Sequence, residues 1–286
     1  MAKELMPGQK RVSPGSVLAD LAIVGWFVFS LFPIFWMLLL AMKTPAEQTT
    51  TYFKFSPTLE NFATVVSQRG TDLTSVDFKG AIFSSVVNCV GAVLVSLVVG
   101  LPAAYAAGRW KFKGGEGLMF NMLSFRFAPE LMIIVPLFVI YNQLGLFNTS
   151  VGMIWVLQLV TMPLVVWILR SYFQDLPEDL EQAALLDGYT RSRAFVMVAL
   201  PMVRPGIAAS ALLAFIFAWN NYVFPLILTD SGSVTVAITK FLGGGGQAYY
   251  NLTAAAALIG ALPPLVLALT IQRYLVRGLS MGAVKA

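Results

Sequence analysis

Long apolar runs separated by shorter polar segments are the dominant pattern of this chain. A helix needs roughly 20 apolar residues to cross the hydrocarbon core of a bilayer, and each of these runs is of that order. The sequence therefore predicts six membrane-spanning helices, at residues 17–42, 80–108, 117–143, 151–172, 207–229 and 254–274. The first run is longer than the apolar core of a secretory signal and lacks a small-residue cleavage site, so we expect it to be retained.

A strongly polar segment at 176–206 separates the fourth apolar run from the fifth. Pro177 suits the first position of a short helix, and Gly188 suits the residue just beyond its end. A second helical piece is expected from Thr190 to Leu200, stopping at Pro201. The first piece carries acidic residues where a helix dipole favours carboxylates, namely Glu178, Asp179 and Glu181, with Asp187 near its end.

Composition supports an integral membrane protein. Of the 286 residues, 58% are hydrophobic and 12% are charged, whereas soluble domains carry about 25% charged residues. The chain has no histidine and a single cysteine, Cys89. An intrachain disulfide is therefore impossible, and a Cys/His metal site is excluded. No catalytic residues and no metal ligands are predicted.

The basic residues indicate how the chain is oriented. If the N-terminus lies inside, the outer segments contain only Lys43, Lys54, Arg69, Lys79 and Lys240, and nearly all other lysines and arginines fall on the inner side. This asymmetry follows the positive-inside rule and is not the clustered pattern of a nucleic-acid site. We therefore expect a cytoplasmic tail at 1–16, an extracytoplasmic loop at 43–79, a core at 80–274 and a cytoplasmic tail at 275–286.

The third predicted span contains two charges and two prolines. Arg126 and Glu130 are four residues apart and would share one face of a continuous helix, which Pro129 and Pro136 interrupt. Charges within a membrane are costly and are usually functional. Two roles are equally open for these side chains. They could contact a substrate or gate, or they could form a mutual pair that merely holds spans together.

The fifth predicted span carries a polar and aromatic group, made of Trp219, Asn220, Asn221 and Tyr222. Aromatic rings can stack on sugars, and amides can bind hydroxyl groups, so this group is a candidate substrate-facing or gating patch. Hydrogen bonding between helices by the two asparagines is the alternative, and it is slightly favoured.

The polar segment at 176–206 resembles the EAA loop of binding-protein-dependent ABC importer permeases. The pattern of that loop is E-A-A, three residues, G, nine residues, then I-x-L-P. Five positions match it at the correct spacing: Ala183, Ala184, Gly188, Leu200 and Pro201. Two positions depart from it: Gln182 stands where the glutamate is usual, with Glu181 one residue upstream, and Val198 replaces the isoleucine.

The resemblance extends to other parts of the chain. FIFAWNNYVFPLIL in the fifth span and RYLVRGLSMGAVKA at the end resemble the carbohydrate-uptake branch, and in particular its maltose-type second permease subunit. The resemblance implies an all-α integral membrane fold of six transmembrane helices, the ABC importer type I permease fold with a cytoplasmic coupling helix. It also implies a bacterial cytoplasmic (inner) membrane location, with both termini cytoplasmic.

The resemblance implies a set of partners as well. These are a second permease subunit in a heterodimer, two copies of an ABC ATPase subunit, an extracytoplasmic solute-binding protein, the lipid bilayer and a sugar or polyol substrate. ATP and Mg would be bound by the ATPase, and no cofactor by this chain. The residues expected to couple to the ATPase are Glu181, Gln182, Ala183, Ala184, Asp187, Gly188 and Pro201.

Two other classes of function compete with a permease. This chain has no G-x-x-x-x-G-K-[ST] motif, and the glycines at 243–246 lack the lysine, so any ATPase must be a partner. A membrane-embedded enzyme would lack histidine and has few membrane carboxylates for hydrolytic or metal chemistry. An ion-driven transporter would need midplane carboxylates, and only Glu130 qualifies.

Overall fold

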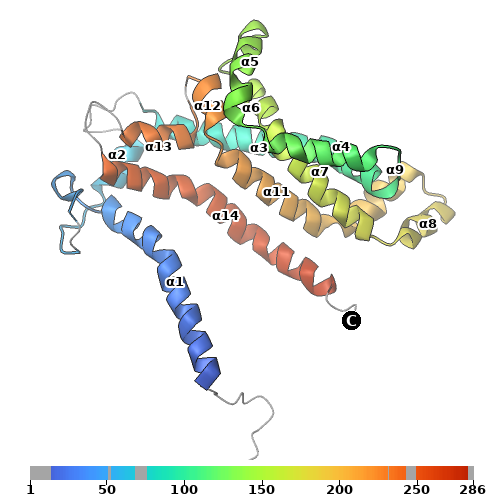
Figure 1. The fold of residues 1–286 in the computed structure, drawn as a ribbon, viewed down its shortest axis with the longest axis horizontal. Helices are drawn as coiled ribbons and strands as arrows, with labels where there is room; N and C mark the ends of the chain where they lie inside the picture. Colours follow the sequence, from blue (N-terminus) through green and yellow to red (C-terminus); the bar gives the residue numbers. More distant parts are fainter. Residues whose placement is uncertain (1–13, 51–52, 68–75, 231, 243–248, 283–286) are drawn as a thin grey trace, which may run out of the picture.

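The structure is a computed structural model that describes residues 14–50, 53–67, 76–230, 232–242 and 249–282. The regular elements of this described part are all helices (Figure 1). Three of them are long and apolar enough to cross a membrane: α1 (Pro14–Ala41), α3 (Phe78–Arg109) and α14 (Tyr250–Gly282), the last through its stretch Tyr250–Gln272. They correspond to the first, second and sixth predicted spans.

The other predicted spans are pairs of helices joined at a bend. α4 (Gly115–Ser124), with the 3-10 turn η2 (Phe125–Phe127), meets α5 (Glu130–Gln143) at 91°. α6 (Ser150–Val156) meets α7 (Gln158–Asp175) at 47°. If each bent pair is one span, the described residues contain up to six spans.

The third bent pair involves the predicted fifth span. Residues 191–202 meet α11 (Arg204–Trp219) at 74°, and α11 is followed by the short helix α12 (Val223–Leu228). A single helix over 207–229 was therefore wrong, because the chain leaves the helix at Asn220 and re-enters one at Val223.

The centre of the bundle is formed by α3, α7 and α11, and α14 packs on α11. Close approach of α3 to α7 depends on small residues: a Cβ on Gly100 would lie 3.1 Å from a Val165 methyl group. The same two helices share a buried polar cluster, in which Ser96 donates to Gln158 at 2.7 Å and lies 2.7 Å from Thr161. Such hydrogen bonds join helices in an apolar environment, where polar atoms have few other partners.

The C-terminal end of α1 and the N-terminal end of α14 meet at a corner built from buried polar side chains. After α1, the chain passes the 3-10 turn η1 (Pro45–Glu47) and α2 (Glu60–Ser67). Asn61 donates to the carbonyl oxygens of Ala41 and Lys43, and Asn251 at the start of α14 donates to Asn61 at 2.9 Å. The fully buried ammonium group of Lys43 donates to the Thr50 carbonyl oxygen at 2.5 Å.

Away from this corner, α1 diverges from the rest of the bundle (Figure 1). Every side chain from Val17 to Phe35 is exposed, including large apolar ones such as Phe29 at 73%. α13 (Val234–Leu242) packs on α3 and α14 near the same corner. The segment with the EAA-like pattern lies at the opposite end of the bundle, at α8 and α9.

Candidate functional site

The EAA-like segment begins with α8 (Glu178–Leu186). Pro177 is the N-cap residue, with extended backbone angles, and so lies one position before the expected first helical position. Gly188 has a left-handed φ of 87°. Its N–H donates to the Leu185 carbonyl oxygen at 3.1 Å, and the N–H of Tyr189 donates to that of Ala184 at 3.0 Å. These two bonds form a Schellman motif, which ends the helix at the predicted place.

The second helical piece has a different form from the one expected. α9 (Arg191–Ala194) is capped by the hydroxyl of Thr190 and passes into a π-helix, η3 (Phe195–Ala199). The chain then continues through Pro201 in α10 (Leu200–Met202) before the bend into α11. The expected stop at Pro201 was wrong, because the wider π turn lets the N–H of Leu200 bond to the Phe195 carbonyl oxygen and carries the helix past the proline.

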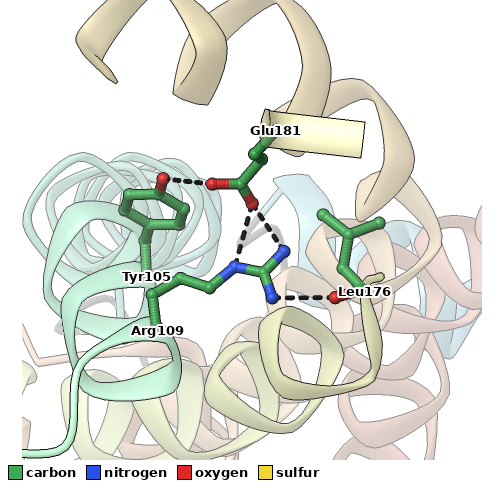
Figure 2. Close-up of polar contacts among 4 residues, drawn as sticks. All are labelled: Tyr105, Arg109, Leu176 and Glu181. Carbon is green, nitrogen blue, oxygen red and sulfur yellow. Dashed lines mark hydrogen bonds and ion pairs between the residues drawn. The ribbon is translucent and has the colours of Figure 1, made fainter. Parts of the chain in front are cut away.

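Glu181 is directed away from solvent and into the membrane bundle (Figure 2). One carboxylate oxygen accepts from the Tyr105 hydroxyl at 2.5 Å, and the other accepts from Nε and Nη2 of Arg109 at 2.9 and 2.5 Å. Arg109 also donates through Nη1 to the carbonyl oxygen of Leu176, just before α8, at 2.7 Å. Both charged side chains are largely buried, so α8 is fixed to the end of α3.

An aromatic cluster completes this attachment. The ring of Tyr105 lies 5.3 Å from that of Phe173 in α7 and 4.6 Å from that of Phe195 in η3, measured between centroids. Trp110, just after α3, packs edge-to-face on Tyr105 at 5.4 Å. Aromatic pairs at these separations attract one another beyond their burial. The EAA-like segment therefore rests on α3 and α7 through packed rings as well as through an ion pair.

The outward face of α8 is small and mixed in character. Gln182, Ala183 and Asp187 are exposed, and Leu186 is 89% exposed. Ala184, in contrast, is buried, with an exposure of 7%. The two alanines of the EAA-like pattern thus differ, since Ala183 faces outward and Ala184 faces inward. Leu186 has no place in the EAA pattern, and its position one turn after Gln182 is the signal that could have identified it.

Arg126 and Glu130 do not share a helix face. The chain is extended at Ala128 and Pro129 between η2 and α5, because proline has no N–H and disfavours a helical residue before it. The Arg126 guanidinium lies over the Phe217 ring of α11 at 3.8 Å, and Glu130 accepts a hydrogen bond from Asn221 at 2.9 Å. The mutual pair is therefore not formed, and both charges contact the fifth span.

The break after α11 is organised by Asn221, which is buried. Besides donating to Glu130, its side-chain oxygen accepts from the N–H of Phe224 at 3.2 Å. Its carbonyl oxygen accepts from the hydroxyl of Thr235 in α13 at 3.0 Å. Asn221 thus joins three elements, which agrees with the interhelical role that the sequence slightly favoured for the asparagines.

A cavity of ≈350 Å³ lies where the breaks of the third and fifth spans meet. Its lining includes five of the six residues proposed for a substrate path: Arg126, Glu130, Asn220, Asn221 and Tyr222. Sequence reasoning missed three further lining residues, Val160, Phe217 and Val223. A volume of this order, with an aromatic ring, amides and two opposite charges, suits a small polar ligand.

Trp219 lies outside this cavity. It is 4% exposed, its ring is stacked on that of Phe215 at 5.5 Å, and its indole N–H donates to the Gly260 carbonyl oxygen in α14 at 3.1 Å. The structure therefore assigns Trp219 to the packing of α11 on α14. The described residues contain no group of three or more potential metal-ligating side chains.

Comparison with known proteins agrees with this arrangement. Residues 96–281 match the family described as the binding-protein-dependent transport system inner membrane component. The trehalose transport system permease protein SugB of Mycobacterium tuberculosis is 34% identical, over 97% of this chain and 99% of its own length. The trehalose/maltose transport system permease protein MalG of Thermococcus litoralis is 31% identical, over 90% of this chain and 92% of its own.

A solved structure shares the fold. The crystal structure of a bacterial ABC transporter involved in the import of the acidic polysaccharide alginate contains a chain that superimposes with a TM-score of 0.72, at 19% identity, covering 94% of this chain and 99% of that one. The family match spans α8 and all three bent pairs of helices. This chain is therefore a member of the family of inner membrane components of binding-protein-dependent transport systems, a permease subunit with an ABC importer fold whose ATPase is a separate subunit.

Proposed function

We propose that this permease imports a sugar or polyol and forms half of the translocation pathway together with a second, different permease subunit. The substrate class is supported by the relatives, which are named for trehalose, maltose and diacetylchitobiose transport. An extracytoplasmic binding protein delivers the substrate, and two copies of an ABC ATPase subunit supply the energy and bind ATP and Mg. This chain lies in a bacterial inner membrane with both termini in the cytoplasm.

We further propose that α8 couples this chain to the ATPase. The supporting observation is the attachment of α8 to the end of α3. The outward face of α8 presents Gln182, Ala183 and Leu186, while Glu181 binds Tyr105 and Arg109 on the opposite side. A helix held in this way transmits a displacement to α3, whereas a free loop would absorb it. The ATPase contacts the outward face, with Asp187 and Gly188 at its end, and Ala184 and Pro201 shape the segment from within.

The cavity between the broken spans is the proposed substrate path. Phe217 and Tyr222 provide aromatic surfaces, and Asn220 provides an amide for hydroxyl groups. Arg126 and Glu130 provide one donor and one acceptor group whose charges cancel, which suits an uncharged polyhydroxylated ligand.

Uptake by purified components tests the proposal. The permease pair, reconstituted in vesicles with the ATPase inside and the binding protein outside, should take up a radiolabelled disaccharide only when the vesicles contain ATP. Uptake by this chain alone on an ion gradient would contradict the proposal. Reporter fusions at both termini test the orientation, which would be wrong if either reporter were active outside.

A further inference from the structure

The turn between α3 and α4 combines cationic and aromatic side chains in alternation. Arg109, at the end of α3, is followed by Trp110, Lys111, Phe112 and Lys113. Arg109 is occupied by Glu181, but within the described part of the chain neither lysine has a carboxylate or a hydrogen-bond acceptor as partner. Trp110 and Phe112 are about half exposed, at 46% and 48%. The turn thus presents two free ammonium groups beside two accessible rings.

Two glycines give this turn its shape. Gly114 has a left-handed φ of 85°, which reverses the chain before α4. At Gly115 an added Cβ would lie 3.1 Å from the Phe112 ring, so the ring folds across the glycine. Phe112 is therefore held in place beside the start of α4, where its ring lines a cavity.

This cavity has a volume of ≈370 Å³ and lies between the turn and α7. The turn lines one side of it with Trp110, Lys111 and Phe112, and Arg170 and Gln174 of α7 line the other. The Arg170 side chain is only 11% exposed; it donates to the Ala107 carbonyl oxygen at 3.3 Å and forms an ion pair with Glu116. Because Glu116 offsets Arg170, Lys111 leaves the cavity with a net positive charge. Lys113 follows two positions later in the same turn.

We propose that this cavity binds the phosphate headgroup of an anionic phospholipid from the inner leaflet. Lys111 and Lys113 attract the phosphate, and Trp110 and Phe112 lie beside the first carbons of the acyl chains. Tryptophan is enriched at the membrane–water interface, and basic residues next to a span attract anionic lipids. A soluble phosphate compound carries the same charge, but it has no apolar chain to contact the half-exposed rings of Trp110 and Phe112 at the end of a membrane helix.

The proposed site shares a side chain with the attachment of α8. Trp110 also lines a second cavity, of ≈300 Å³, whose wall includes Tyr105, Glu181 and Gln182. The indole ring packs on Tyr105, and Tyr105 donates to Glu181. A headgroup seated against Trp110 therefore supports the ring on which the position of α8 depends. This inference rests on the orientation proposed above, in which the turn is cytoplasmic.

Lipid binding to the complete transporter tests the inference. The complex is titrated with phosphatidylglycerol and, separately, with phosphatidylcholine, and bound lipid is counted by native mass spectrometry. Each lysine should contribute roughly 5-fold, so the double variant Lys111→Gln/Lys113→Gln should bind phosphatidylglycerol roughly 25-fold more weakly, with phosphatidylcholine unaffected. The matched control is Lys54→Gln/Lys240→Gln, two exposed lysines of the opposite side, which should behave as the wild type.

Equal phosphatidylglycerol binding by both double variants would overturn the inference. A further arm offers glycerophosphoglycerol, the headgroup without its acyl chains, to the complex in phosphatidylcholine nanodiscs. If it bound as tightly as the lipid, the site would serve a soluble phosphate and the lipid would be excluded. The same spectra report whether the ATPase is bound, so failure of the coupling proposal would be seen separately from failure of lipid binding.

Discussion

Glu181 in α8 and Arg109 at the end of α3 form an ion pair, in which one carboxylate oxygen lies 2.5 Å from Nη2 and 2.9 Å from Nε. The two residues are 72 positions apart in the chain. The pair faces inward, and the side-chain exposures are 14% for Glu181 and 7% for Arg109. The Tyr105 hydroxyl donates a hydrogen bond to the other carboxylate oxygen. The helix that we propose to contact the ATPase is thus bonded to α3 through its inward-facing side.

Removing one partner of this pair should loosen α8. We expect Arg109→Leu to cost about 3 kcal/mol of stability, because it leaves the Glu181 carboxylate buried without its cation. Thermal unfolding of the purified chain measures the loss, and ATP hydrolysis that continues without matching uptake would show the uncoupling. Glu116→Gln is the control: Glu116 is 83% exposed, so its pair with Arg170 should contribute less than about 1 kcal/mol. Equal costs for the two changes would contradict the role of the buried pair.

Leu186 should contribute to the contact with the ATPase. Because its side chain is 89% exposed, Leu186→Ser should leave the stability of the chain within about 0.5 kcal/mol of the wild type while reducing co-purification of the ATPase. Leu59, 68% exposed before α2, offers a matched control at the opposite end of the bundle. Leu59→Ser should retain the ATPase, and an unchanged ATPase yield with Leu186→Ser would exclude that contact.

The cost in stability of replacing Gly188 should depend on how readily the new residue adopts a left-handed φ. No atom lies within 4 Å of an added Cβ, so the cost of Gly188→Ala comes from the left-handed φ alone, at about 1 kcal/mol. Gly188→Asn should cost less, because asparagine accepts that conformation more readily. Gly117→Ala in α4, where space is also open and φ is ordinary, should be neutral or stabilising. Thermal unfolding of the three variants would contradict the Schellman assignment if Gly188→Ala matched Gly117→Ala.

Exchanging the charges at positions 126 and 130 should not restore function. Arg126→Glu/Glu130→Arg should be at least as impaired in uptake as either single reversal, since each side chain contacts the fifth span rather than the other. Asn221→Ala should cost about 2 kcal/mol, because it removes a hydrogen bond to a charged group. Recovery of uptake in the double reversal would show that the two charges pair after all.

Trp219 should matter for packing rather than for substrate recognition. Trp219→Phe removes the indole N–H that bonds to Gly260, and we expect a loss of about 1 kcal/mol with the KM for uptake unchanged. Tyr222→Phe provides the comparison within the cavity, where removal of the hydroxyl should raise KM with little change in stability. A raised KM for Trp219→Phe would show that Trp219 contributes to substrate binding, and it would contradict a role in packing alone.

The apolar runs were sufficient to predict the continuous spans in α1, α3 and α14, because the length and apolarity of a span are local properties of the sequence. Gly188 likewise indicated the end of α8, since a helix end that needs a left-handed residue depends on its own few positions. Pro129 indicated an interruption of the third span. Its 91° bend could not be predicted, because the direction of the chain after a break is decided by what it packs against.

Side-chain partners far apart in the sequence could not be predicted in the same way. Spacing placed Arg126 and Glu130 on one helix face, and the break at Pro129 separated them. Glu181 was expected to face the ATPase because it neighbours the EAA pattern, yet its bonds go to Tyr105 and Arg109. Such partners follow from the packing of α3 beside α8, which no local pattern contains.

The buried corner of Asn61, Asn251 and Lys43 has a mechanical consequence. It joins the C-terminal end of α1 to the N-terminal end of α14, while α1 is otherwise largely exposed and diverges from the bundle (Figure 1). A rod fixed at one end can only pivot. At 1.5 Å per residue a helix of 28 residues is about 42 Å long, so a rotation of about 10° at the corner sweeps its free end through roughly 7 Å. The corner is therefore a pivot, and a small rotation of α1 there becomes a larger displacement at the N-terminal end of that helix.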